Sequence, residues 1–243
     1  MFFNVFMELT DIKPILEEPG FVILDKPAGV LIHPVVEGTE QAGTITGWLL
    51  EHYPEVKTVG DKPSVRPGIV HRLDKGTSGV LLVCRTQAFF DYMKAQFQTY
   101  TVQKSYLALV YGVPKPEGVI DRPIGLRSGS IKRSVSAKKM KMIKPAVTEY
   151  KTLQTFECDG EKYSLVRLVP KTGRTHQLRV HMASIGCPVV GDPLYGREKN
   201  TLGLARQFLH AERIEFSLPD GRKICAESKF PKELKIILDH FVK

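Results

Sequence analysis

The sequence predicts an α+β fold built around a mainly antiparallel sheet. Apolar segments of strand length alternate with segments in which apolar residues recur at helical spacing. Successive strand segments are mostly neighbours in the chain, and tight turns separate several of them, which favours antiparallel pairing. With 42% hydrophobic and 25% charged residues among 243, the chain can bury a core of ordinary size.

The first predicted elements are a strand and a helix. Residues 21–24 form a short apolar run that leads into a turn containing Pro and Gly. Residues 44–53 carry apolar side chains at helical spacing, with Thr44 as a candidate N-cap and Pro54 as the stop. We therefore expect a buried strand followed by a short helix.

Three further elements follow in the middle of the chain. Residues 80–84 are predicted to form a strand, and aromatic residues at helical intervals place one apolar face on residues 87–98. We interpret that aromatic stripe as core rather than as a cofactor site. Residues 106–111 are apolar in both alternating positions, as in a strand that is buried on both faces.

The second half of the chain predicts a hairpin and a helix. Residues 147–156 and 163–169 form the two strands, joined by the Asp159-Gly160 turn. Residues 175–184 fit a helix that ends at Gly186. The segment between residues 122 and 144 is expected to be a loop, because its interleaved serines and glycines do not form a packed face.

A strand at residues 211–218 and an amphipathic helix at residues 232–241 complete the prediction. No clean linker divides the chain. We therefore predict an N-terminal extension at residues 1–20 and a single domain at residues 21–243.

The charge of the protein is strongly basic and clustered. There are 35 Lys plus Arg against 26 Asp plus Glu, for a net charge of +9. One acid-free window holds eight basic residues, namely Arg122, Arg127, Lys132, Arg133, Lys138, Lys139, Lys141 and Lys144. A second, at residues 162–191, adds five more together with two histidines. Such clustering indicates either solvated loops or a patch for a polyanion such as nucleic acid.

Several other classes of protein are disfavoured. No window approaches the run of about 18 apolar residues that a membrane helix needs, and the basic window lacks the apolar face of a membrane-surface helix. The N-terminus lacks a basic leader, which argues against secretion. The four cysteines lie far apart without a C-x-x-C pair, so we expect no metal site, no disulfide framework and a cytoplasmic location.

Two polar segments could carry chemistry. The first is a glycine-bearing loop at residues 71–79, whose single carboxylate is Asp74. Asp74 could cap a turn or form a structural ion pair, or it could act as a nucleophile or base. In the second segment, residues 173–181, a helix would place Thr175 and Arg179 on one face and Gln177 and His181 on another. Arg179 is suited to phosphate or to a carboxylate such as Asp74.

A third segment, at residues 104–106, contains a strand tyrosine, Tyr106, whose ring could be core or could stack on a base taken out of an RNA helix. In order and context, the three segments resemble the RluA-type pseudouridine synthases. The matching blocks are His71-Arg72-Leu73-Asp74-x-x-Thr77-Ser78-Gly79, Lys104-x-Tyr106-x-Ala108 and Gly173-Arg174-Thr175-His176-Gln177-Leu178-Arg179-Val180-His181. Supporting blocks lie at residues 25–29, 33–34, 191–196 and 209–211.

The resemblance implies the pseudouridine synthase fold and isomerisation of uridine to pseudouridine in RNA, without a metal or other cofactor. Asp74 matches the family's nucleophile, and Tyr106 matches the tyrosine that stacks on the target base. Arg179 matches the basic residue that pairs with the aspartate. Arg72 matches the arginine that enters the space left by the flipped nucleotide. We expect the remaining RNA contacts from His71, Lys104, Arg174, His176, Lys138, Lys139 and Lys141.

The resulting hypothesis is an RNA pseudouridine synthase acting on ribosomal RNA or tRNA, with no obligate protein partner and no membrane attachment. The main alternative is a non-catalytic RNA-binding or ribosome-assembly protein with the same fold. A double-stranded DNA binder is less favoured, because no helix-turn-helix or finger pattern is present. Many relatives carry an S4-like RNA-binding module, and the roughly twenty residues before the expected fold are too few for one.

Overall fold

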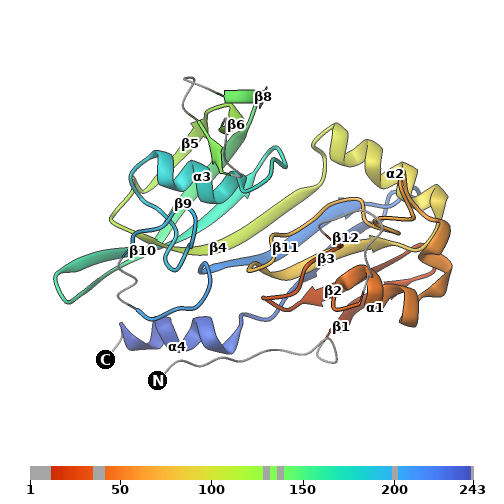
Figure 1. Cartoon of the computed structure of the whole chain (residues 1–243), viewed down its shortest axis with the longest axis horizontal. Helices are drawn as coiled ribbons and strands as arrows, with labels where there is room; N and C mark the ends of the chain where they lie inside the picture. Colours follow the sequence, from red (N-terminus) through yellow and green to blue (C-terminus); the bar gives the residue numbers. More distant parts are fainter. Residues whose placement is uncertain (1–11, 35–41, 128–131, 136–139, 199–201, 242–243) are drawn as a thin grey trace. The chain divides into compact units, whose positions relative to one another are not determined.

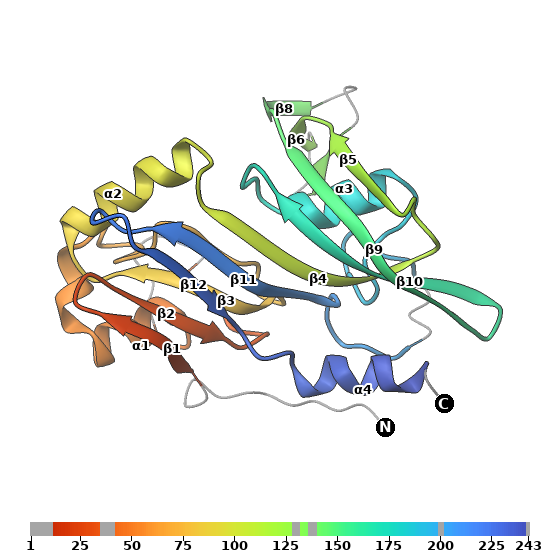
Figure 2. The same cartoon turned by 180° about the vertical axis from the view of Figure 1, so that it is seen from behind.

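The computed structural model describes residues 12–34, 42–127, 132–135, 140–198 and 202–241. Their contacts divide them into two compact units (Figures 1 and 2). The N-terminal unit comprises the described residues of Val5–Gln103 and Ala211–Lys229, and the C-terminal unit those of Lys104–His210 and Phe230–Lys243. Among the described residues, no helix is long and apolar enough to cross a membrane.

The N-terminal unit is a sheet with helices on both faces. Its strands, in spatial order, are β1 (Lys13–Glu18), β2 (Phe21–Lys26), β3 (Ser78–Cys84), β11 (Leu209–Ser217) and β12 (Lys223–Glu227). The β1–β2, β2–β3 and β11–β12 pairs are antiparallel (Figure 2). Strand β1 lies inside the segment predicted as an extension, where it pairs with β2. The boundary proposed at residue 20 stays a prediction.

The alternation along β2 explains why its first four residues, 21–24, are all apolar. Phe21 and Ile23 pack in one cluster with α2 (Gln87–Gln98), whereas Val22 and Leu24 pack in another with α1 (Ile45–His52). Side chains of a strand point alternately to opposite faces, so two covering helices bury both sets. The predicted strand and both helices are therefore confirmed.

The two helices begin where capping residues predict. The Thr44 hydroxyl accepts a hydrogen bond from the Gly47 amide at 3.1 Å, which satisfies a free amide of the first turn of α1. Thr86 caps α2 in the same way. Pro54 follows α1 and opens a short 3₁₀ helix (Pro54–Thr58).

The described residues of the C-terminal unit include a four-stranded antiparallel array and two helices. The strands, in spatial order, are β4 (Gln103–Tyr111), β10 (Glu161–Pro170), β9 (Val147–Cys158) and β5 (Glu117–Asp121). The helices are α3 (Gln177–Ser184) and α4 (Lys232–His240). Asp159 and Gly160 both have positive φ, as the predicted tight hairpin between β9 and β10 requires (Figure 1). Gly186, at φ +79°, ends α3.

The basic window differs from the expected loop. Its described residues contain β6 (Ile124–Arg127), β7 (Arg133–Ser134) and β8 (Met140–Lys144), which form a small antiparallel sheet in the order β7-β6-β8. Ile124 is buried against Ala146 and Val180. The prediction of a loop without a packed face was wrong here, because one buried isoleucine and strand pairing suffice to order short strands between polar turns.

Candidate active site

Asp74 lies on the loop that precedes β3 in the N-terminal unit. Leu73 is buried while Asp74 is only half-buried, so the apolar neighbour anchors the loop and leaves the carboxylate nearer to solvent. The Thr77 amide donates to the Asp74 carbonyl at 3.0 Å and closes the turn. At Gly79, with φ +114°, a Cβ atom would lie 2.1 Å from the Ala211 carbonyl oxygen, so only glycine fits where the loop enters β3.

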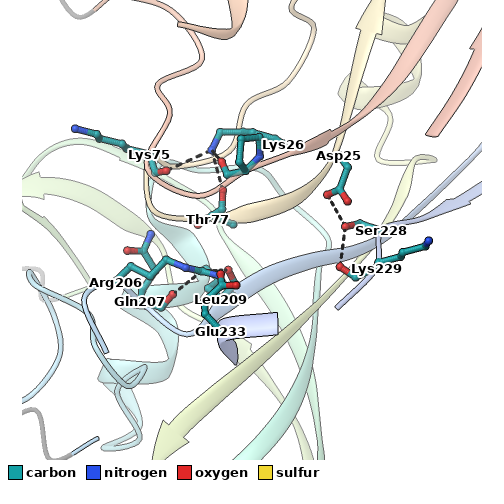
Figure 3. A network of polar contacts seen from close by, with 11 residues as sticks. Asp25, Lys26, Lys75, Thr77, Arg206, Gln207, Leu209, Ser228, Lys229 and Glu233 are labelled. Atoms are coloured by element: carbon teal, nitrogen blue, oxygen red, sulfur yellow. Dashed lines mark hydrogen bonds and ion pairs between the residues drawn. The ribbon is translucent and has the colours of Figure 1, made fainter. Parts of the chain in front are cut away.

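A buried lysine ties this loop to β2. Lys26 has no exposed surface, and its ammonium donates to the carbonyls of Pro27 at 2.7 Å, Thr77 at 2.9 Å and Lys75 at 3.3 Å (Figure 3). The Gly29 amide also donates to the Lys75 carbonyl, at 2.8 Å. The block at residues 25–29, noticed in the sequence without an assigned role, thus holds the backbone on the C-terminal side of Asp74.

Lys26→Met is expected to lower the free energy of unfolding by about 1–3 kcal/mol, because the Pro27 and Thr77 carbonyls each lose a buried hydrogen bond. Any chemistry that depends on Asp74 should fall as well, since the loop loses its tie to β2. Urea denaturation measures the first effect. Lys75→Met is the matched control, because the Lys75 side chain is exposed on the same loop and the substitution should cost less than about 0.5 kcal/mol. Equal losses in the two variants would contradict the anchoring role.

Two further residues of the loop have defined partners. The His71 Nε2 accepts a hydrogen bond from the Leu82 amide at 2.9 Å, and its ring stacks on Phe97 with the centroids 5.1 Å apart. Arg72 is exposed, and its Nη1 donates to the His33 Nε2 at 3.2 Å. His71 is thus held against β3, whereas Arg72 extends towards solvent. RNA contacts by either residue stay predictions.

Arg179 belongs to the C-terminal unit and has a buried acidic partner there. Its Nε and Nη2 donate to the two carboxylate oxygens of Asp192, both at 2.7 Å. The side chains of Arg179 and Asp192 are 4% and 0% exposed. Asp192 Oδ1 also accepts from the Leu194 and Tyr195 amides at 2.8 and 3.1 Å. A bidentate pair of this kind sets the plane of the guanidinium.

Asp192 was missed as a site residue in the sequence, although its block was noticed. The usable signal was an aspartate followed by proline within a Gly-rich block, which is typical of a turn whose side chain accepts backbone amides. The expected pairing of Arg179 with Asp74 stays a prediction, because these two residues belong to different units.

The segment that opens α3 departs from the predicted helix. His176 has φ +57°, so the helix begins at Gln177 instead of residue 175, and Thr175 does not share a helical face with Arg179. That prediction was wrong. His176 Nδ1 lies 3.0 Å from the Tyr195 hydroxyl, which also accepts from the Arg133 amide at 2.8 Å. A left-handed residue at this point lets the chain turn before it enters α3.

Gln177 and His181 do share one face of α3, and both contact Thr148 on β9. The Gln177 Nε2 donates to the Thr148 hydroxyl at 3.0 Å, and that hydroxyl lies 2.9 Å from the His181 Nδ1. The His181 Nε2 lies 2.9 Å from the Arg122 carbonyl, which can only accept. The ring is therefore protonated at Nε2, and Thr148 donates to Nδ1. Burial lowers the pKa of His181, in keeping with this neutral form.

The remaining predicted site residues lie on or beside strands of the C-terminal unit. Lys104 and Tyr106 are two positions apart on β4, so their side chains share one face of the strand, and both are half-buried. Burial lowers the pKa of Lys104 to about 8. The Arg174 Nε donates to the Pro145 carbonyl at 2.9 Å. Lys141 is exposed on β8.

Lys138 and Lys139 lie outside the described residues. Within the part of the chain that the structure describes, no group of three or more His, Cys, Asp or Glu side chains could hold a metal ion.

The chain combines an α+β fold with an anchored aspartate loop and a buried arginine–aspartate pair, and it is similar to proteins of known family. The sequence profile described as RNA pseudouridylate synthase matches residues 20–184. The protein belongs to the RNA pseudouridylate synthase family, as the resemblance implied.

Named relatives agree with this assignment. The chain is 38% identical to "Ribosomal large subunit pseudouridine synthase D" of Nitrosomonas europaea, over 95% of this chain and 65% of the relative. It is 40% identical to an "Uncharacterized RNA pseudouridine synthase" of Chloroflexus aurantiacus, over 88% of this chain and 64% of that protein. The chain thus spans just under two thirds of the length of these relatives.

Solved structures confirm the fold. The human protein "RNA Pseudouridylate Synthase Domain Containing 1" is similar with a TM-score of 0.74 and 27% identity, covering 93% of this chain and 87% of that one. The related human "Domain Containing 4" protein gives a TM-score of 0.70 and 26% identity. The predicted α+β pseudouridine synthase fold is therefore confirmed.

Proposed function

We propose that the protein isomerises uridine to pseudouridine in RNA, with Asp74 as the nucleophile. The observation that carries the proposal is the aspartate loop itself: Asp74 is half-buried, and the following backbone is tied to β2 by Lys26. A nucleophile must be held in place before its target arrives, and backbone ties of this kind supply that rigidity. Family membership supplies the reaction class.

The chemistry needs only groups that the chain carries. The Asp74 carboxylate attacks C6 of the uracil or C1′ of the ribose, and the bond between N1 and C1′ breaks. The base turns, C5 bonds to C1′, the C5 proton leaves and N1 regains a proton. No atom or electron is gained overall, and the aspartate is released unchanged. Water has to be kept away from the reacting groups while the base is detached.

We assign the other roles by the matched positions. Tyr106 stacks on the target base, Arg179 pairs with Asp74, and Arg72 fills the space that the flipped nucleotide leaves. Flipping the target nucleotide out of the helix breaks base stacking and costs on the order of a few kcal/mol. Contacts to the RNA phosphates offset this cost. His71, Lys104, Arg174, His176, Lys138, Lys139 and Lys141 are proposed to contact the RNA.

The proposed substrate is ribosomal RNA or tRNA. Several relatives are named for the large ribosomal subunit, including those of Nitrosomonas europaea and Pseudomonas aeruginosa, which favours ribosomal RNA. Cytoplasmic location and independence from an obligate protein partner stay predictions. The test is to incubate the purified protein with unmodified ribosomal RNA and tRNA transcripts and to map pseudouridine. RNA binding without any new pseudouridine would favour the alternative of a non-catalytic RNA-binding or ribosome-assembly protein.

The basic window gives a separate prediction. Replacing Lys138, Lys139 and Lys141 together by alanine is expected to weaken RNA binding, and each lost phosphate contact should lower the slope of log K against log salt by about one. Replacing the exposed lysines Lys57, Lys62 and Lys223, which lie outside the window, removes the same charge and serves as the control. A slope that is the same in both triple variants would show that the window does not contact RNA.

A further inference from the structure

His33 stands immediately after a buried segment and carries two directed hydrogen bonds. Its Nδ1 lies 2.9 Å from the Pro34 carbonyl oxygen, and its Nε2 lies 3.2 Å from the Arg72 Nη1. The His33-Pro34 pair lies in a block that supports the family resemblance, but no role was predicted for it, and the proposed chemistry does not use it.

The partners of His33 determine which ring nitrogen carries the proton. A carbonyl oxygen only accepts, so the Nδ1 must donate to Pro34. A guanidinium only donates, so the Nε2 must present its lone pair to Arg72. The neutral ring protonated at Nδ1 satisfies both bonds at once, whereas a doubly protonated ring has no acceptor for Arg72.

His33 is mounted on a fixed part of the N-terminal unit. The Leu31 and Ile32 carbonyls accept from the Ile45 and Thr46 amides, both at 2.9 Å, so the chain before His33 is bonded to the first turn of α1. Ile32 itself is buried. The acceptor that Arg72 meets is therefore attached to a capped helix rather than to a free loop.

The backbone of Arg72 is fixed by its two neighbours, whereas its side chain is long and flexible. His71 is bonded to the Leu82 amide and Leu73 is buried, which sets the backbone at Arg72. The exposed guanidinium would otherwise sample many rotamers, and ordering an arginine side chain opposes binding. The hydrogen bond to His33, whose backbone is held by α1, restricts the Arg72 rotamers before RNA binds.

We propose that His33 is a positioning residue that holds the Arg72 guanidinium oriented before RNA binds, and so favours extrusion of the target nucleotide. The inference rests on the proposed function, because it takes Arg72 as the residue that fills the vacated space. His33 acts only through Arg72 and does not itself contact the reacting base.

Two substitutions distinguish the contribution of the His33 lone pair from that of its ring. His33→Phe keeps the ring and removes the acceptor, whereas His33→Gln removes the ring and keeps an acceptor at about the distance of Nε2. With the transcript that the wild-type protein modifies, His33→Phe should lower kcat/KM about three- to tenfold, the range of one exposed hydrogen bond. His33→Gln should stay within about twofold of wild type. The fluorescence of 2-aminopurine placed beside the target uridine reports unstacking of the RNA bases. It should show less unstacking with His33→Phe than with the wild type, and no such decrease with His33→Gln.

A double-mutant cycle tests whether the effect passes through Arg72. In an Arg72→Ala background, His33→Phe should cause no further loss. A further loss there, or a failure of His33→Gln to restore the rate, would overturn the proposal. If His33→Phe does not fold, as judged by circular dichroism, His33→Ala replaces it in the cycle.

Nuclear magnetic resonance of the free protein keeps this test distinct from that of the proposed function. The order parameter of the Arg72 Nε–H should fall in His33→Phe and be retained in His33→Gln. Wild-type protein that makes no pseudouridine would overturn the proposed function and the positioning role together. An active wild type whose rate and order parameter are unchanged by His33→Phe would overturn the positioning role alone.

Discussion

Asp74→Asn is expected to abolish pseudouridine formation while RNA binding largely survives. The amide keeps the size of the side chain but is a far weaker nucleophile than a carboxylate, so the covalent step is lost. The Thr77 bond to the Asp74 carbonyl uses only backbone atoms, so the loop should keep its shape. Product is measured by mapping pseudouridine in the modified transcript, and binding by filter retention of the same RNA.

The control for this variant makes the same chemical change elsewhere in the N-terminal unit. Asp61→Asn alters an exposed carboxylate that pairs with Lys94, and it should leave the yield of product unchanged. An undiminished yield in Asp74→Asn would refute the nucleophile assignment. Loss of RNA binding together with activity would instead show that the carboxylate shapes the binding surface.

Asp192→Asn should lower the free energy of unfolding by about 3–5 kcal/mol, the range for removing one partner of a buried ion pair. The Arg179 guanidinium is 4% exposed and donates twice to Asp192, so the substitution removes a buried, bidentate ion pair. Urea denaturation followed by circular dichroism measures the change. Turnover should also fall, because the plane of the guanidinium is no longer set.

Asp239→Asn provides the comparison for an exposed pair. Asp239 accepts from Lys235 one turn earlier on α4, both side chains are more than half exposed, and the loss should be about 0.5 kcal/mol or less. If Asp192→Asn costs no more than Asp239→Asn, the Arg179–Asp192 pair does not stabilise the C-terminal unit.

Sequence reasoning located elements whose signals are local. Helix α2 spans the predicted residues 87–98, because Thr86 caps it and its aromatic stripe has one period throughout. Helix α3 was placed two residues too early, because nothing in the sequence marks His176 as left-handed. The strands of the basic window were missed for a related reason: they are short, and the burial of Ile124 depends on residues far along the chain.

In the candidate site, too, residues with a local sequence signal were predicted, whereas residues defined by distant contacts were not. Asp74, Tyr106 and Arg179 were proposed as site residues because they lie in contiguous blocks of distinctive residues, and their roles stay predictions. Lys26 lacked an assigned role, because a lysine that bonds carbonyls 49 and 51 residues away has no local signature. Asp192 lacked one as well, because its partner Arg179 lies in another block of the sequence. A buried charge becomes visible only when its distant partners are known.

The Lys26 anchor has a consequence for how the loop tolerates sequence change. Lys26 bonds to carbonyl groups, which every residue carries, and not to the side chains of the loop. The exposed side chain at position 75 can therefore vary without releasing the backbone that follows Asp74. Substitution at position 75 changes the exposed surface of the loop, while the backbone beside Asp74 stays tied to β2.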